Sequence, residues 1–210
     1  MYEIQHLIDG HTVTGSSGET GPVFDPATGE QTAKVALASA AEVDAAVASA
    51  KAAFDEWGGV SLARRTKLLL AFRNLVVDNS DEIAQRLTAE HGKVLEDARG
   101  EVARGIENIE FSCGVADALK GTHSEQASSG VDVYTVRQPL GVVAGIPPFN
   151  FPAMVPMWMF PNAVACGNTF VLKPSERDPS APMFVAELFP EAGFPPGVLN
   201  EVNGDKVAVD

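Results

Sequence analysis

Residues 142–146, Val-Val-Ala-Gly-Ile, form a short run that is apolar on both faces, as a strand buried in a parallel sheet is. Two further runs share this character: residues 169–172, Thr-Phe-Val-Leu, and, more weakly, residues 198–202, Val-Leu-Asn-Glu-Val. Helical stretches lie between them, at about 153–165 and 180–192. Strand, helix, strand, helix and strand in this order predict an α/β fold with a parallel sheet, built from two consecutive right-handed crossovers.

A layer of helices is predicted upstream of these strands. The first helix opens at Ser39, which has capping-box spacing to Glu42, and ends at Gly58. Its apolar residues recur at helical intervals: Val43, Val47, Ala50, Phe54 and Trp57. Three more helices are predicted, at about 62–77, 81–91 and 95–120.

The first forty residues contain several short β-prone runs. Asp9 and Gly10 separate two of them and fit a type I′ hairpin, and a second turn falls at residues 25–29. Farther along, residues 122–130 are polar and are predicted to form a loop. Residues 131–136 alternate with a two-residue period, which predicts a half-buried strand.

The composition narrows the class of protein. Among 210 residues, 15 Lys and Arg stand against 28 Asp and Glu, and the basic residues are dispersed, so nucleic acid is not expected as a partner. The longest apolar run, about 153–166, contains prolines and is shorter than the roughly 18 to 20 residues of a bilayer span. No secretory signal is visible, and we expect a cytoplasmic protein that does not bind membranes.

Candidate ligand-binding residues follow the first two strands of the predicted sheet. Asn150 lies in a proline-rich loop and can offer an amide donor that polarises a carbonyl group. Lys173 and Glu176 follow the next strand and could donate to and accept from ribose hydroxyls. A structural alternative is left open for each: Asn150 could cap the following helix, and Lys173 and Glu176 could be a solvated pair.

Other signatures of chemistry are missing from the sequence. Neither a GxGxxG nor a GxxxxGK[ST] fingerprint occurs, and the two cysteines have no metal-binding spacing, so no metal site is predicted. Cys166 is expected at a helix C-terminus, where the helix dipole raises the pKa of a thiol. Cys113 falls on an apolar helical stripe. Neither thiol is predicted to be an activated nucleophile.

The same segments resemble the aldehyde dehydrogenase superfamily. Residues 148–152, Pro-Phe-Asn-Phe-Pro, are followed by Gly-Asn-Thr at 167–169 and Leu-Lys-Pro-Ser-Glu at 172–176, in the order and at the intervals of that family's signature motifs. The Phe that replaces the commoner Trp, together with residues 157–161 and 104–107, resembles one branch, the CoA-acylating methylmalonate-semialdehyde dehydrogenases.

This resemblance implies an incomplete Rossmann-like cofactor domain with an N-terminal hairpin. Residues 1–210 would be the N-terminal portion of the NAD-binding domain, residues 122–138 an oligomerisation arm, and the catalytic domain would lie later in the chain. The implied cofactor is NAD, with CoA as co-substrate. The implied reaction is the oxidation of malonate or methylmalonate semialdehyde to acetyl-CoA or propionyl-CoA, by a homodimer or homotetramer.

The resemblance also implies roles for individual residues. Asn150 matches the family's asparagine that helps form the oxyanion hole, and Lys173 and Glu176 match the residues that hold the adenosine ribose of NAD. Arg104 matches an arginine proposed to pair with the substrate's carboxylate, and its alternative is a surface arginine. Three further residues match neighbouring cofactor contacts: Pro147, which is usually Ala or Thr, Phe149 and Arg177.

In relatives, the nucleophilic cysteine lies later in the chain than residue 210. The resemblance therefore implies that these 210 residues alone are inactive. Two alternatives stay open: a hydrolytic aldehyde dehydrogenase, and, for this chain by itself, a non-catalytic fragment that binds NAD or serves assembly.

Overall fold

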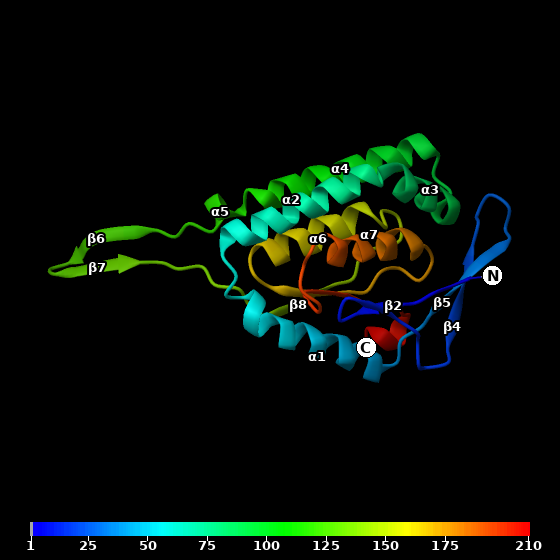
Figure 1. Ribbon diagram of the computed structural model, residues 1–210, viewed down its shortest axis with the longest axis horizontal. Coiled ribbons are helices and arrows are strands. Elements are labelled where there is room, and N and C mark those ends of the chain that lie inside the picture. Colours follow the sequence, from blue (N-terminus) through cyan, green and yellow to red (C-terminus); the bar gives the residue numbers. More distant parts are fainter. Residues whose placement is uncertain (1) are drawn as a thin grey trace.

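A five-stranded sheet forms the centre of the computed structural model, which describes residues 2–210 (Figure 1). Strand β8 (Val142–Gly145) pairs in parallel with β9 (Thr169–Leu172), and β9 pairs in parallel with β10 (Leu199–Glu201). The hairpin of β2 (His6–Ile8) and β3 (His11–Val13) continues the sheet in antiparallel fashion beside β10. The predicted parallel α/β sheet is confirmed, and the N-terminal hairpin extends it.

Helices cover both faces of this sheet. Helix α1 (Ala40–Trp57) packs on one face, and α6 (Met154–Ala165) and α7 (Ser180–Glu191) lie on the other (Figure 1). Three further helices form an outer layer over α6 and α7: α2 (Leu62–Asp78), α3 (Ser80–His91) and α4 (Leu95–Cys113). The predicted helical layer is therefore confirmed.

Aromatic side chains hold these layers together. Phe160 of α6 lies with its ring centre 5.7 Å from that of Phe72 in α2 and 5.8 Å from that of Phe189 in α7. All three rings are buried and meet edge to face. Edge-to-face contacts add to the free energy of burying such large side chains, so this cluster fixes α2, α6 and α7 to one another.

The N-terminal turns form as the sequence predicts. Asp9 and Gly10 have φ of 54° and 74°, the two positive values that a type I′ hairpin requires. The turn at 25–29 joins β4 (Thr20–Phe24) to β5 (Gln31–Ala36) in a small second sheet, where β1 (Tyr2–Ile4) is the third strand. Within residues 2–210, no helix has the length and apolar character needed to cross a membrane.

The start of α1 shows why that helix begins at Ser39. The carboxylate of Glu42 accepts hydrogen bonds from the backbone N–H groups of Ser39, at 2.9 Å, and Ser16, at 2.6 Å. Burial alone would raise the pKa of Glu42, but these hydrogen bonds outweigh it and lower the pKa to about 2. The predicted apolar stripe is only partly correct, because Val47 is 40% exposed.

The region between α4 and β8 differs from the sequence prediction. The long helix ends at Cys113, and a short helix, α5 (Val115–Ala118), follows Gly114. The predicted loop at 122–130 is wrong: it contains β6 (His123–Ser128), which pairs with β7 (Val131–Tyr134). The predicted half-burial is also wrong, because every residue of both strands is exposed. The two strands form a ribbon that projects from the body (Figure 1), so its apolar face has no core to pack against.

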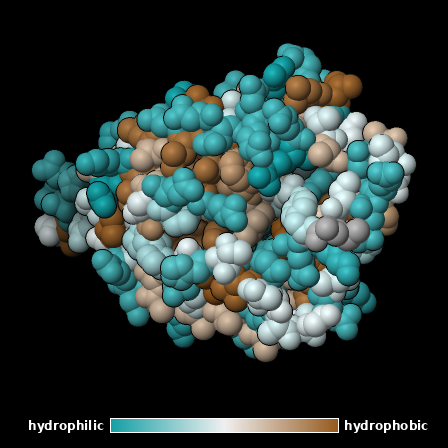
Figure 2. Space-filling model, turned by 45° about the vertical axis from the view of Figure 1, so that its right-hand side comes forward, coloured by the Kyte–Doolittle hydropathy of each residue, from teal (hydrophilic) through white to brown (hydrophobic). Residues whose placement is uncertain are grey.

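Strand β8 departs from its prediction in a similar way. The run at 142–146 was expected to be buried on both faces, but Ala144 and Ile146 are exposed. The reason is that β8 is an edge strand of the sheet, and a mostly apolar hollow of about 400 Å³ lies between it and α1. On the face shown in Figure 2, apolar side chains likewise reach the surface in separate patches among hydrophilic ones.

Glu201 of β10 is fully buried, and neither of its carboxylate oxygens has a hydrogen-bond partner within residues 2–210. Burial, aided by the negative charge of Glu187, raises its pKa well above the usual 4.5. Because the pKa of Glu201 is higher in the folded state than in the unfolded state, the stability that this group contributes is fully present below pH 4.5. This contribution is lost as the pH rises toward the folded pKa.

We therefore expect Glu201→Gln to lose less stability than the wild type between about pH 5 and about pH 8. Urea unfolding at both pH values measures the difference. The exposed Glu19→Gln carries the same chemical change at the surface and should keep the wild-type slope. Equal slopes for Glu201→Gln and wild type would show that Glu201 is ionised in the folded protein.

Candidate functional site

Two loops lie together at one edge of the central sheet. Residue Gly145 at the end of β8 is paired with Leu172 at the end of β9, so the segments that follow both strands leave the sheet side by side. The backbone N–H of Lys173 donates to the carbonyl of Gly145 at 3.0 Å. The guanidinium carbon of Arg177 lies 4.9 Å from the ring centre of Phe149. The structure thus brings the two predicted clusters of cofactor-binding residues together.

Lys173 and Glu176 form a pair in the second loop. Lys173 Nζ lies 3.3 Å from Glu176 Oε2, and the side chains are 13% and 42% exposed. The alternative in which Lys173 and Glu176 are merely a solvated pair does not fit, because the side chain of Lys173 is largely buried. Lys173 also lines the apolar hollow beside β8, together with Gly145 and Ile146. A donor and an acceptor at the end of an apolar hollow suit a ligand that joins sugar hydroxyls to an apolar ring.

Asn150 is exposed in the first loop, ahead of α6. The cap of α6 is Ala153, and the first free N–H groups, those of Ala153 and Met154, both donate to Glu101 Oε1 at 3.0 Å. The alternative in which Asn150 caps the following helix is therefore wrong. Pro147, at the start of the same loop, is buried.

Arg104 of α4 faces the same space as Asn150. A hollow of about 390 Å³ is lined by the end of α3, the segment that joins α3 to α4, α4 itself and the first loop: His91, Lys93, Glu96, Asp97, Gly100, Arg104, Asn150 and Phe151. Arg104 Nε donates to Met154 Sδ at 3.3 Å, a weak contact. An amide donor and a guanidinium in one hollow suit a ligand that carries both a carbonyl and a carboxylate.

The sequence analysis missed two residues at this hollow: Lys93, which lines it, and Glu101, which pairs with Lys93. Glu101 is fully buried, and its carboxylate forms an ion pair with Lys93, whose side chain is 10% exposed. Lys93 Nζ also donates to the backbone carbonyl of Asn150 at 3.2 Å. One signal could have revealed Glu101: it is an acidic residue on the helix face that also carries Ala98 and Val102.

A buried carboxyl group also lies behind the second loop. Asp178 is 2% exposed, and burial, helped by the nearby charges of Glu90 and Glu101, raises its pKa to about 7, although Ser175 and Lys93 oppose the shift. Glu90 Oε2 accepts a hydrogen bond from the N–H of Ser180 at the start of α7, at 2.9 Å. Burial raises the pKa of Glu90 as well.

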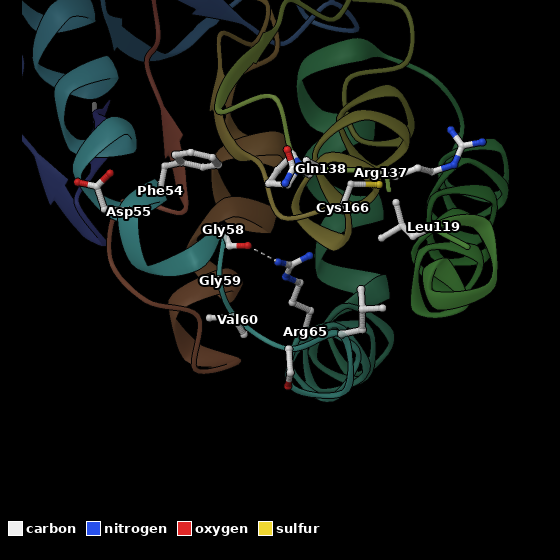
Figure 3. A pocket seen from close by; sticks show the side chains of 13 residues that line it. Phe54, Asp55, Gly58, Gly59, Val60, Arg65, Leu119, Arg137, Gln138 and Cys166 are labelled. Atoms are coloured by element: carbon white, nitrogen blue, oxygen red, sulfur yellow. Dashed lines mark hydrogen bonds between the residues drawn. The ribbon is translucent and has the colours of Figure 1, made fainter. Parts of the chain in front are cut away.

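Cys166 lies away from both loops, at the opposite end of α6 from Asn150. It lines a separate hollow of about 680 Å³ beside Arg65 (Figure 3). Arg65 donates to the carbonyls of Gly58 at 2.9 Å and Ala165 at 3.3 Å. Burial raises the pKa of the Cys166 thiol more than Arg65 lowers it, and burial also raises the pKa of Cys113. Neither shift favours the thiolate form that a nucleophile needs.

Within the described part of the chain, no three His, Cys, Asp or Glu side chains are placed to hold a metal ion. The residues at the sheet edge instead fit a nucleotide: Lys173 and Glu176 provide one donor and one acceptor, and the hollow beside them is apolar. The roles of individual residues inferred from the sequence stay predictions.

Comparisons with known proteins place this geometry in context. The family model "Aldehyde dehydrogenase family" matches residues 13–210. The chain is 51% identical over 210 residues to malonate-semialdehyde dehydrogenase from Pseudomonas aeruginosa, covering 100% of this chain and 42% of that protein. It is 47% identical over 207 residues to the acylating, mitochondrial methylmalonate-semialdehyde dehydrogenase of Arabidopsis thaliana, covering 99% of this chain and 34% of that protein. The chain thus spans less than half the length of these relatives.

The chain also matches solved structures over its whole length. A methylmalonate-semialdehyde dehydrogenase from Oceanimonas doudoroffii has a TM-score of 0.98 at 50% identity, over 100% of this chain and 43% of that one. A protein from Sinorhizobium meliloti that is described as the same enzyme and was solved in complex with NAD has a TM-score of 0.98 at 53% identity, with the same coverage.

The buried carboxyl of Asp178 gives a test of the electrostatics behind the second loop. Its pKa of about 7 lies above the usual 3.8, so the stability that it contributes is present below pH 3.8 and is lost as the pH rises through about 7. We expect its carboxyl carbon to titrate with a midpoint near 7 in NMR spectra, and Asp178→Asn to flatten the stability profile over this range. A midpoint near 4 would contradict the expected desolvation.

Proposed function

The chain belongs to the aldehyde dehydrogenase family, and from that premise we propose that it forms the N-terminal part of an NAD-dependent, CoA-acylating semialdehyde dehydrogenase. The substrates would be malonate or methylmalonate semialdehyde, and the products acetyl-CoA or propionyl-CoA. Residues 1–210 would be the N-terminal portion of the NAD-binding domain of this enzyme. High identity to relatives that carry these names supports the proposal.

One observation carries the substrate class: Asn150 and Arg104, which are 46 positions apart in sequence, line one hollow. A semialdehyde of this kind has an aldehyde at one end and a carboxylate at the other. The guanidinium of Arg104 can hold the carboxylate through paired hydrogen bonds. The amide of Asn150 then meets the carbonyl end. This match between two side chains and two functional groups supports a semialdehyde over a simple aldehyde.

The cofactor side of the proposal rests on the second loop. Lys173 and Glu176 would hold the ribose hydroxyls of the adenosine part of NAD, with Phe149 and Arg177 as neighbouring contacts and Pro147 reached through its backbone. The solved relative from Sinorhizobium meliloti contains NAD, which supports this cofactor. When bound, NAD accepts a hydride from the substrate carbon.

In the reaction, the residues of this chain would orient the substrate and stabilise charge. A nucleophile that attacks the aldehyde pushes negative charge onto the carbonyl oxygen, and the amide of Asn150 would donate a hydrogen bond to that oxygen. Arg104 would keep the other end of the substrate fixed while the charge develops. Cys166 and Cys113 do not fit the role of nucleophile, because burial raises the pKa of both thiols. We propose that these 210 residues alone have no activity.

The exposed ribbon of β6 and β7 is proposed as the arm through which subunits assemble into a homodimer or homotetramer. Its residues Val131 and Val133 are each 49% exposed, and Tyr134 is 72% exposed. Apolar side chains on a projecting two-stranded ribbon are more stable when a second subunit covers them.

The proposed cofactor site is tested by Lys173→Met. We expect the Kd for NAD to rise about tenfold or more, which corresponds to about 1.4 kcal/mol, because the ribose loses a charged donor. Isothermal titration calorimetry measures the Kd. Lys120→Met, which removes an exposed lysine outside both candidate loops, should leave the Kd unchanged. An unchanged Kd for Lys173→Met would place the cofactor elsewhere.

The proposed reaction is tested in the intact enzyme by following NADH formation from malonate and methylmalonate semialdehyde with and without CoA. We expect NADH formation to require CoA, and Asn150→Ala to lower kcat about 10²- to 10³-fold while the Kd for NAD stays the same. Asn74→Ala, at an exposed position of α2, is the matched control. NADH formation that is indifferent to CoA would favour the hydrolytic alternative and contradict our assignment.

A further inference from the structure

Lys93 and Glu101 form a buried ion pair directly behind the loop that carries Asn150. We propose that these two are positioning residues: together they fix the backbone at Asn150 and again three to four residues after it, and so set the direction of its amide. The inference rests on the proposed function, since the direction of the amide matters only if Asn150 stabilises the oxyanion. The contacts that carry it are independent of that function.

Glu101 acts on the downstream side of Asn150. Its Oε1 accepts the N–H groups of Ala153 and Met154, both at 3.0 Å, which are among the four N–H groups that a helix leaves unpaired at its start. Its Oε2 receives Lys93. A carboxylate at this end of α6 also interacts favourably with the helix dipole. The first turn of α6 is therefore held to α4 by a side chain that is fully buried.

Lys93 acts on Asn150 itself. Its ammonium group donates to the Asn150 carbonyl at 3.2 Å while it is paired with Glu101, and it lies 4.8 Å from the ring centre of Phe151. The exposed residue that would meet the substrate is thus held at its own carbonyl and again three residues later. Both contacts are made by one ion pair, that of Lys93 with Glu101.

A gain in the stability of the fold is a poor explanation for the buried ion pair of Lys93 with Glu101. The desolvation of two charges often exceeds their mutual attraction, and apolar residues of similar size are commonly as stabilising as a buried pair. An apolar pair could not donate to the Asn150 carbonyl or accept from two backbone N–H groups. The geometry therefore favours control of loop position, where a shift of about 1 Å can cost about 10²-fold in rate.

Amide hydrogen exchange tests the positioning role without reference to activity. In Lys93→Met we expect the N–H groups of Phe151, Ala153 and Met154 to exchange about tenfold faster, while those of β9 stay within about twofold of wild type. Lys93→Arg, which keeps the charge and donors, should restore slow exchange. Arg73→Met breaks the exposed pair of Arg73 with Glu110 of α4 and should change neither region.

Unchanged exchange in the loop, or an equal increase in β9, would overturn the inference. If Lys93→Met does not fold, Lys93→Gln, which keeps a neutral donor, takes its place. The exchange rates of its loop N–H groups are then compared with those of its β9 N–H groups in the same way.

Kinetics of the intact enzyme separate this inference from the proposed function. We expect Lys93→Met to lower kcat about 10-fold to 10²-fold with an unchanged Kd for NAD, and Lys93→Arg to recover most of kcat. A normal kcat in a variant whose loop exchanges faster would also overturn the positioning role. A wild-type enzyme that oxidises no semialdehyde would instead refute the proposed function, and hydrogen exchange would still decide whether Lys93 and Glu101 fix the loop.

Discussion

Parallel pairing of β8 with β9 is the constraint on which the candidate site depends. Because parallel strands end at the same edge of a sheet, the ladder that joins Gly145 to Leu172 forces the two following loops to lie together. Phe149 and Arg177, which are in contact, are 28 positions apart in sequence, and no local interaction would bring them together. Phe160 of α6 packs against Phe189 of α7 and Phe170 of β9, and so fixes both helices against the sheet.

Buried carboxylates connect the outer helical layer to this edge. Glu101 of α4 holds the start of α6, and Glu90 of α3 holds the start of α7 through the N–H of Ser180. Each helix begins just after one of the two candidate loops, so α3 and α4 position the loops from behind. Burial raises the pKa of Asp178, which follows the second loop, to about 7, and the nearby charges of Glu90 and Glu101 add to this shift.

The sequence predicts most of the fold because strands β8 to β10 and the helices between them carry clear apolar patterns. It also predicts that Asn150 and Lys173 follow strand ends, and the family resemblance adds Arg104. It misses β6, because the residues of that strand, His-Ser-Glu-Gln-Ala-Ser, are mostly polar and show no apolar period, whereas the alternation of valines in β7 is detectable. It misses the contact of Lys93 with Asn150, because a bond across 57 positions depends on tertiary packing and leaves no local pattern.

The net charge of −13 makes the local arrangement of cations decisive for anionic ligands. Lys93 is paired with Glu101, and Lys173 with Glu176, so neither adds much positive potential beyond its own loop. Arg104 instead contacts a methionine sulfur, and Arg177 lies against the ring of Phe149. Arginine keeps its charge in such settings and is weakly hydrated. Among the described residues neither arginine forms an ion pair with a carboxylate, so these two guanidinium groups are the cations of the candidate site that are left free for an anionic ligand.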